Sequence, residues 1–256
     1  MARLALLAAA LVTAFPTTGS AGAESPAGPD WAANVAAASG FAATRAGPTS
    51  FALVDGRGRL RGRLAGRVYP SASVLKPMLL AAYLNRPDVR GRALTVEERA
   101  LLGPMIRRSA NPPASYLVRL LGAGPLHRLA ARGGMDHFRL RSPWGLSETT
   151  ARGQALFFRR MGALTPARHR AYARRLLSGV VPGQRWGVPR VAPAGWKVFL
   201  KGGWGSGTGW VTHQVALLEH GERRLSLAVL TRDNPSHAYG VATIEGVARR
   251  LLRDLR

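Results

Sequence analysis

Segments with strand character lie near the two ends of this chain, and segments with helical character lie between them. Residues 50–54 and 60–65 are short apolar runs joined by the turn sequence 55-DGRG-58, which predicts a β-hairpin. Strand character returns at residues 197–201, 209–219 and 224–231. The N-terminal and C-terminal strands can share one core if all of them pair in one antiparallel sheet and the residues between them form an inserted lobe.

The middle of the chain carries helix signals. Thr95 and Glu98 form a capping box for a helix that extends to about residue 108. Helices at residues 31–38 and 236–255 would flank the strands. The sequence therefore predicts an α+β fold: an antiparallel sheet flanked by N- and C-terminal helices, with an inserted all-helical lobe. The remaining expected helices are 74–84, 113–121, 125–132, 149–161 and 166–177.

We expect residues 31–256 to form one domain. At this length, 46% hydrophobic residues suffice for one sizeable core. Its sheet lobe would comprise about residues 31–68 and 190–256, and its helical lobe about residues 69–189.

The first 23 residues have the pattern of a secretory signal peptide. Arg3 gives a positive start, residues 4–15 are apolar but too few to span a membrane, and 21-AGA-23 is a small-residue cleavage site. The alternative, an apolar helix of the folded domain, is disfavoured by Pro16. Residues 24–30 would form a loose leader. We expect a secreted protein, extracellular or in the cell-envelope space, monomeric and without a membrane span.

The chain has no cysteine and a formal net charge of +24. The absence of cysteine excludes thiol catalysis, cysteine-ligated metal sites and a lipid anchor at the cleavage site. The charge indicates either a densely anionic partner, such as nucleic acid or cell wall, or the arginine-rich composition of a GC-rich genome. Because the arginines are scattered, we expect no nucleic-acid partner. The six histidines show no metal-binding spacing, so we expect no metal and no cofactor.

Lysine is rare, since among 37 basic residues only Lys76, Lys197 and Lys201 are lysines. Lys76 lies three positions after Ser73 in 71-SASVLKPML-79, on the same face of a helix that starts near the serine. A serine hydroxyl needs a base to become a nucleophile. A buried lysine beside another cation can lose its proton near neutrality, which arginine cannot. The alternative is an ordinary helix start with a chance lysine.

Two other short motifs accompany this one. The tripeptide 109-SAN-111 lies between helical segments, and 201-KGGWGSGTGW-210 follows an apolar strand. Glycines such as Gly203 leave a strand edge open to the backbone of a substrate. Alone, these motifs could equally be a turn and a glycine-rich hairpin.

In this order, Ser73-x-x-Lys76, Ser109-x-Asn111 and Lys201-x-Gly resemble the motifs of class A β-lactamases and penicillin-binding proteins. The resemblance extends from about residue 51 to the C-terminal helix. It implies that Ser73 is the acylated nucleophile, that Lys76 is its base and that Ser109 passes a proton to the leaving nitrogen. Asn111 would hold the substrate amide, and Lys201 would supply positive potential.

The resemblance also implies a substrate-binding strand edge. The backbone N–H groups of Ser73 and Trp204 would form an oxyanion hole beside Gly203. Gly202 stands where a hydroxyl residue usually meets the substrate carboxylate, and Thr208 or Ser206 would have to replace that hydroxyl. Ala110 stands where aspartate is usual. Among the tryptophans, we expect only Trp204 and Trp210 to line a groove.

The segment between Ser109 and Lys201 is shorter than in the enzymes it resembles. The loop that carries the deacylating glutamate is therefore expected to be truncated. Glu148 matches a structural acidic residue before two threonines, and the alternative is that it activates water. Hydrolysis of an acyl-enzyme needs a positioned water and a base, so the motifs predict acylation but supply no assigned base for turnover.

The leading prediction is an exported active-site serine hydrolase that attacks a β-lactam or related amide through an acyl-serine. One alternative is a D-Ala-D-Ala carboxypeptidase or esterase-like hydrolase that acts on cell-wall peptide with the same residues. Another is a non-catalytic cell-wall binding protein with the same fold.

Overall fold

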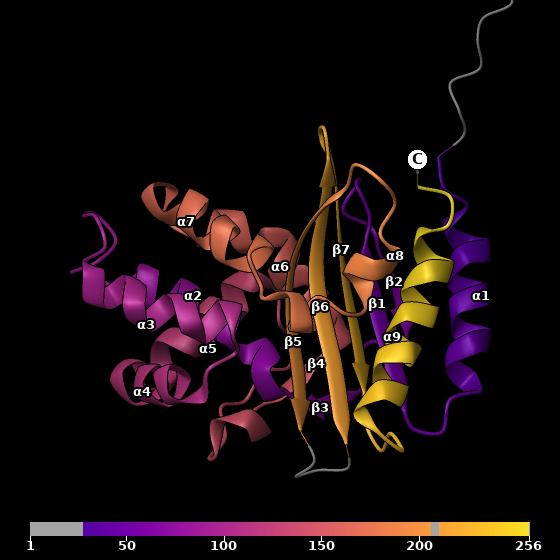
Figure 1. Ribbon diagram of the computed structural model, residues 1–256, viewed down its shortest axis with the longest axis horizontal. Coiled ribbons are helices and arrows are strands. Elements are labelled where there is room, and N and C mark those ends of the chain that lie inside the picture. Colours follow the sequence, from indigo (N-terminus) through magenta and orange to yellow (C-terminus); the bar gives the residue numbers. More distant parts are fainter. Residues whose placement is uncertain (1–27, 206–209, 256) are drawn as a thin grey trace, which may run out of the picture.

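One antiparallel sheet joins the two ends of the chain (Figure 1). The computed structural model describes residues 28–205 and 210–255, and in them the strand order is β2-β1-β7-β6-β5. Strands β1 and β7 pair with Phe51 opposite Val229. The predicted single sheet built from both ends of the chain is confirmed. Its strands are β1 (Thr49–Val54), β2 (Leu60–Arg63), β5 (Lys197–Gly205), β6 (Val211–His220) and β7 (Arg223–Thr231).

Helices cover both faces of the sheet (Figure 1). On one face lie α1 (Trp31–Ala43), α9 (His237–Leu252) and the short α8 (Val188–Val191). On the other face, α6 (Ala151–Leu164) contacts β1, β6 and β7 and joins the sheet to the helical lobe. The other helices of that lobe are α2 (Lys76–Leu84), α3 (Val96–Arg107), α4 (Asn111–Leu121), α5 (Ala123–Gly133) and α7 (Ala167–Ser178).

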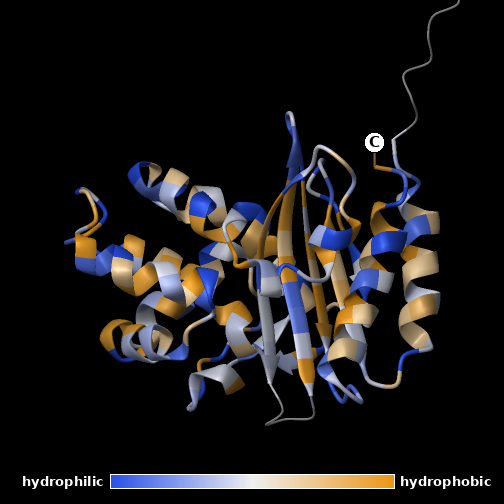
Figure 2. Ribbon diagram, viewed as in Figure 1, coloured by the Kyte–Doolittle hydropathy of each residue, from blue (hydrophilic) through white to orange (hydrophobic). Residues whose placement is uncertain are grey.

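The two faces of the sheet contribute to two hydrophobic cores. Every residue of β1 is buried because both faces are covered. Ala52 and Val54 belong to the core shared with the helical lobe, whereas Phe51 and Leu53 belong to the core under α1 and α9. Figure 2 shows hydrophobic and hydrophilic residues interleaved along the helices, as one-sided burial requires.

A short two-stranded ribbon, which the sequence did not predict, links the two lobes. Strand β3 (Val68–Pro70) pairs with β4 (Glu148–Thr150), which places Glu148 opposite Pro70. The helix expected over residues 149–161 therefore begins only at Ala151, because the Thr150 hydroxyl caps it by accepting a hydrogen bond from Gly153 N at 3.0 Å. The remaining short elements are the 3₁₀ turns η1 (Ala72–Leu75), η2 (Trp144–Leu146) and η3 (Pro182–Gln184).

Local signals located most other boundaries. The capping box of Thr95 and Glu98 is present, with both of its hydrogen bonds. Strand β2 ends at Arg63 rather than at residue 65, because Leu64 turns into the left-handed region with φ 47°. Helix α4 begins at Asn111, two residues before its expected start. In the described ranges, no helix is both long and apolar enough to cross a membrane.

Candidate active site

Ser73 lies at the junction between the sheet and the helical lobe. It belongs to η1, between β3 and α2, and only 8% of its surface is exposed to solvent. Ser71 N donates a hydrogen bond of 2.6 Å to Ser147 O, which ties the start of this turn to the segment before β4. The turn is 3₁₀ at Ser73 and becomes α-helical at Lys76, with Pro77 in the first helical turn, where its missing N–H costs nothing.

The amine of Lys76 is the centre of a buried cluster of hydrogen bonds. Lys76 is fully buried, and its Nζ donates to Ser73 Oγ at 2.9 Å and to Asn111 Oδ1 at 2.8 Å. It also contacts Ser109, with the backbone carbonyl at 2.5 Å and Oγ at 3.1 Å. Burial lowers the pKa of Lys76 to about 7. Near neutrality this lysine can therefore hold or release a proton beside the serine.

Lys201 approaches the same cluster from the sheet. It is fully buried on β5, and its Nζ donates to Ser109 Oγ at 2.9 Å and to Gly202 O at 2.7 Å. Burial, with the nearby positive charge of Lys76 as a smaller cause, lowers the pKa of Lys201 well below its usual value. The two amines thus share one hydroxyl, and the positive charge of Lys76 disfavours a proton on Lys201.

Ser109 joins these groups from the connection between α3 and α4. Its φ of 57° lies in the left-handed region, which costs a non-glycine residue about 1 kcal/mol or more. This conformation turns both its carbonyl and its hydroxyl toward Lys76. Asn111 follows in the first turn of α4 and directs its amide oxygen to the same amine. The structure therefore brings Ser73, Lys76, Ser109, Asn111 and Lys201 together.

Strand β5 passes directly beside the backbone of Ser73. A Cβ built on Gly203 would lie 2.9 Å from Ser73 N, so only glycine lets the strand approach this closely. Trp204, the next residue, is 37% exposed. This places the backbone of Gly203 and Trp204 next to that of Ser73, where the resemblance to class A β-lactamases implies an oxyanion hole. Thr208 and Ser206, expected to supply a hydroxyl, lie outside the described residues.

A cavity of about 360 Å³ opens at Ser73. Ser73, Asn111 and Ser115 are among the residues that supply its polar groups, and none of the described residues that line it is ionisable. Two tryptophans form much of its wall: Trp204, as expected, and Trp144, which the sequence analysis did not expect in a groove. Trp144 is held by η2 and by a hydrogen bond of 2.9 Å from Nε1 to Ser115 Oγ. Trp210 is 49% exposed and does not line the cavity.

The tryptophan rings also face the two lysines. Lys76 Nζ lies 5.1 Å from the centre of the Trp144 ring, and Lys201 Nζ lies 5.8 Å from that of Trp204. Trp144 follows an irregular loop, so no periodic pattern in the sequence marks it. Its position at the cavity depends on the pairing of β3 with β4.

Glu148, the acidic residue of the β3–β4 ribbon, is engaged in ion pairs. Its Oε1 accepts from Arg141 at 2.6 Å and 2.9 Å, and its Oε2 lies 3.0 Å from His137 Nε2. Hydrogen bonds from Arg141 and then from His137 keep the pKa of Glu148 below its usual value. This geometry suits a structural carboxylate. Among the described residues, no group of three or more metal-ligating side chains could hold a metal ion.

Comparisons with known proteins identify the family and the fold. The model of the Beta-lactamase enzyme family (Beta-lactamase2) matches residues 86–255, a span that includes Ser109, Asn111 and Lys201 and begins after Ser73 and Lys76. No curated protein matches the sequence.

Several solved structures share the fold. A β-lactamase from Sphaerobacter thermophilus is 21% identical with a TM-score of 0.73, over 88% of this chain and 97% of that one. A β lactamase from Xanthomonas campestris pv. campestris is 20% identical with a TM-score of 0.75, over 87% and 97%. The class A β-lactamase of the last common ancestor of Gram-negative bacteria is 22% identical with a TM-score of 0.75, over 88% and 100%. The chain therefore belongs to the β-lactamase enzyme family, whose members are serine hydrolases, and has the class A β-lactamase fold.

Proposed function

We propose that the protein is an exported hydrolase that forms an acyl-enzyme on Ser73 from a β-lactam or a related amide or ester. The observation that carries the proposal is the 2.9 Å contact between the Lys76 amine and the Ser73 hydroxyl inside a buried cluster. The signal-like pattern of residues 1–23 supports export.

Acylation can proceed with the groups in this cluster. The neutral amine of Lys76 takes the proton of Ser73 Oγ, which attacks the carbonyl carbon of the substrate. Backbone N–H groups of Ser73 and Trp204 stabilise the resulting oxyanion. A proton reaches the leaving nitrogen or oxygen through Ser109 Oγ, which contacts both lysines. The bond to the leaving group then breaks, and the acyl group remains on Ser73.

Release of the acyl group is the slow step in this proposal. Hydrolysis needs a base that activates water close to the ester. Among the described residues, no carboxylate lines the cavity at Ser73, and Glu148 is held by Arg141 and His137. A long-lived acyl-enzyme favours the peptidase-like or esterase-like alternative over an efficient β-lactamase.

The cavity favours an uncharged, apolar substrate group. Its described lining combines tryptophan rings with small and aliphatic residues and contains no ionisable side chain, while Lys201 is wholly buried and does not line it. Gly202 offers no hydroxyl for a carboxylate. We infer that neutral esters and amides with apolar acyl groups acylate Ser73 more readily than their charged analogues of equal size.

Mass spectrometry of the intact protein tests the proposal. The wild-type protein is incubated with a fluorescent penicillin and, separately, with p-nitrophenyl butyrate. We expect a covalent adduct that the Ser73→Ala variant does not form. An adduct that persists for hours with little released product supports the peptidase-like reading, and rapid turnover of penicillin supports a β-lactamase. If neither compound labels or is hydrolysed, the protein is a binding protein and the proposal is wrong.

A further inference from the structure

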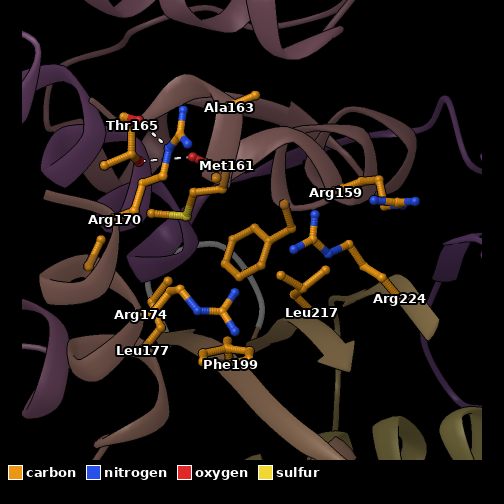
Figure 3. A pocket seen from close by; sticks show the side chains of 13 residues that line it. Arg159, Met161, Ala163, Thr165, Arg170, Arg174, Leu177, Phe199, Leu217 and Arg224 are labelled. Carbon is orange, nitrogen blue, oxygen red and sulfur yellow. Dashed lines mark hydrogen bonds between the residues drawn. The ribbon is translucent and has the colours of Figure 1, made fainter. Parts of the chain in front are cut away.

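A second and larger cavity lies on the face of the sheet opposite α1 and α9. It has a volume of about 490 Å³ and lies between α6, α7 and the strands β5, β6 and β7 (Figure 3). This volume is within the range of small-molecule sites, about 300–1,000 Å³. None of its lining residues lines the cavity at Ser73. A ligand of this cavity therefore does not need to contact Ser73 or the two lysines beside it.

The floor of this cavity is hydrophobic. Phe158 of α6, Phe199 of β5 and Leu217 of β6 line it, and each is at least nine-tenths buried. All three also belong to the core between the sheet and the helical lobe. The cavity is therefore a recess into the core, and it offers an apolar group the same environment that those side chains have.

Four arginines surround this apolar floor. They are Arg159 of α6, Arg170 and Arg174 of α7, and Arg224 of β7. Figure 3 shows Arg224 reaching into the cavity near Leu217, and Arg174 lying against Phe199. The guanidinium carbon of Arg174 lies 4.1 Å from the centre of the Phe199 ring.

The negative charge supplied by the protein does not balance these four arginines. In the described part of the chain, Glu219 is the one carboxylate that hydrogen-bonds to them, and it binds both Arg174 and Arg224. Arg170 donates to the Thr165 carbonyl, which is neutral. The wall of the cavity thus carries an excess of positive charge.

Among these four arginines, Arg159 has a buried nitrogen that makes no hydrogen bond. Its Nε is buried and has no hydrogen-bond partner, and its terminal nitrogen only reaches Gly56 O at 3.5 Å. Burial, and then the charge of Arg224, lowers the pKa of Arg159. A buried Nε without a hydrogen-bond partner is costly for the folded protein, and an anion bound by the guanidinium groups of Arg159 and Arg224 would reduce that cost.

We propose that this cavity binds an amphipathic organic anion, a carboxylate with an apolar chain or ring. Its carboxylate lies between Arg159 and Arg224, whose planar guanidinium groups match the two oxygens of a carboxylate. Its apolar part lies against Phe158, Phe199 and Leu217. The site is separate from the proposed hydrolase site, and binding involves no reaction at Ser73.

Isothermal titration calorimetry with laurate, below its micelle-forming concentration, tests this site. We expect one laurate to bind per protein. Arg159→Gln and Arg224→Gln should each weaken binding by about ten-fold or more, because each removes a charged hydrogen bond to the carboxylate. Arg168→Gln is the matched control, since Arg168 is an exposed arginine of α7 that does not line the cavity. Dodecyltrimethylammonium, which has a similar chain and the opposite charge, should not bind.

A second pair of variants tests the location without changing charge. Gly162 lines the cavity, and a Cβ there meets no atom within 4 Å. The Gly162→Phe variant should therefore fold, and its ring should occupy part of the cavity. Gly103 in α3 also has open space and lines no part of this cavity, so Gly103→Phe controls for phenylalanine in a helix. Loss of laurate binding in Gly162→Phe but not in Gly103→Phe supports the site. Absence of laurate binding, equal binding by all variants, or equal binding of the cationic detergent overturns it.

Discussion

The indole of Trp186 fills the space beside Gly202 on β5. A Cβ built on Gly202 would lie 2.8 Å from Cζ2 of Trp186, well inside the roughly 3.5–4.0 Å at which carbon atoms pack. The hydroxyl residue that the resemblance leads one to expect at position 202 is therefore replaced by a tryptophan ring from another segment. At position 202 the packing of Trp186 therefore leaves room only for glycine.

A threonine at position 202 should destabilise the protein. Gly202→Thr forces Trp186 out of its position, and overpacking of this kind costs about 1–3 kcal/mol. Urea unfolding measures the loss. Gly205→Thr is the matched control, because Gly205 lies on the same strand and its Cβ would meet no atom within 4 Å. Equal stability of the two variants would show that Trp186 does not restrict position 202.

The rate of Ser73 acylation should rise with pH through about 7. The pKa of Lys76 is lowered to about 7 by burial, and the amine accepts the serine proton only in its neutral form, so the active fraction grows as pH increases. Stopped-flow measurement of adduct formation between pH 5.5 and 8.5 checks this. A rate that does not change over this range would exclude Lys76 as the base.

Replacing Lys76 with arginine should abolish most of the acylation. Arginine keeps the positive charge but cannot act as a base, and loss of a general base costs about 100-fold or more in rate. Lys197→Arg provides the control, since Lys197 is exposed at the start of the strand that carries Lys201. If Lys76→Arg and Lys197→Arg are acylated at similar rates, the role assigned to Lys76 is wrong.

Glu148→Gln should leave the lifetime of the acyl-enzyme unchanged. Its carboxylate is held by Arg141 and His137 and does not line the cavity at Ser73, so water at the ester does not depend on it. The variant should instead unfold at a lower temperature than Glu97→Gln, which alters an exposed glutamate of α3. A much longer adduct lifetime in Glu148→Gln would identify Glu148 as the deacylating base.

The stability of the protein should fall as pH decreases from about 6.5 to 4, in part because of His213. This buried histidine of β6 lies 2.9 Å from Pro70 O through Nε2 and accepts from Thr231 N through Nδ1, so its neutral form is required. Burial lowers its pKa to about 4.

Between these two pH values the unfolded state binds the proton and the folded state does not, so the free energy of unfolding declines by about 3 kcal/mol. Urea titrations at several pH values should show a shallower decline in His213→Gln than in the wild type. His127→Gln, at an exposed position, should keep the wild-type slope. If all three slopes agree, His213 does not contribute to the pH dependence.

The parts of the site that depend on local spacing could be predicted from the sequence. Ser73 and Lys76 are three residues apart across one helical turn, so their contact follows from helix geometry. The capping box at Thr95 and the hairpin after Val54 are local in the same sense. The predicted pairing of terminal strands also needed only the order of strand and helix segments along the chain.

Other features depend on contacts between distant segments. Ser109 and Lys201 meet across 92 residues of sequence because the helical lobe places the α3–α4 connection against β5. Trp144 reaches the cavity through the β3–β4 ribbon, and Trp186 fills the space at Gly202. The sequence by itself determined which residue types were available for acylation and where the local turns lie. Only the tertiary structure decided which amines share a hydroxyl, which rings line the cavity and which carboxylates stay outside it, because burial and long-range packing set these contacts.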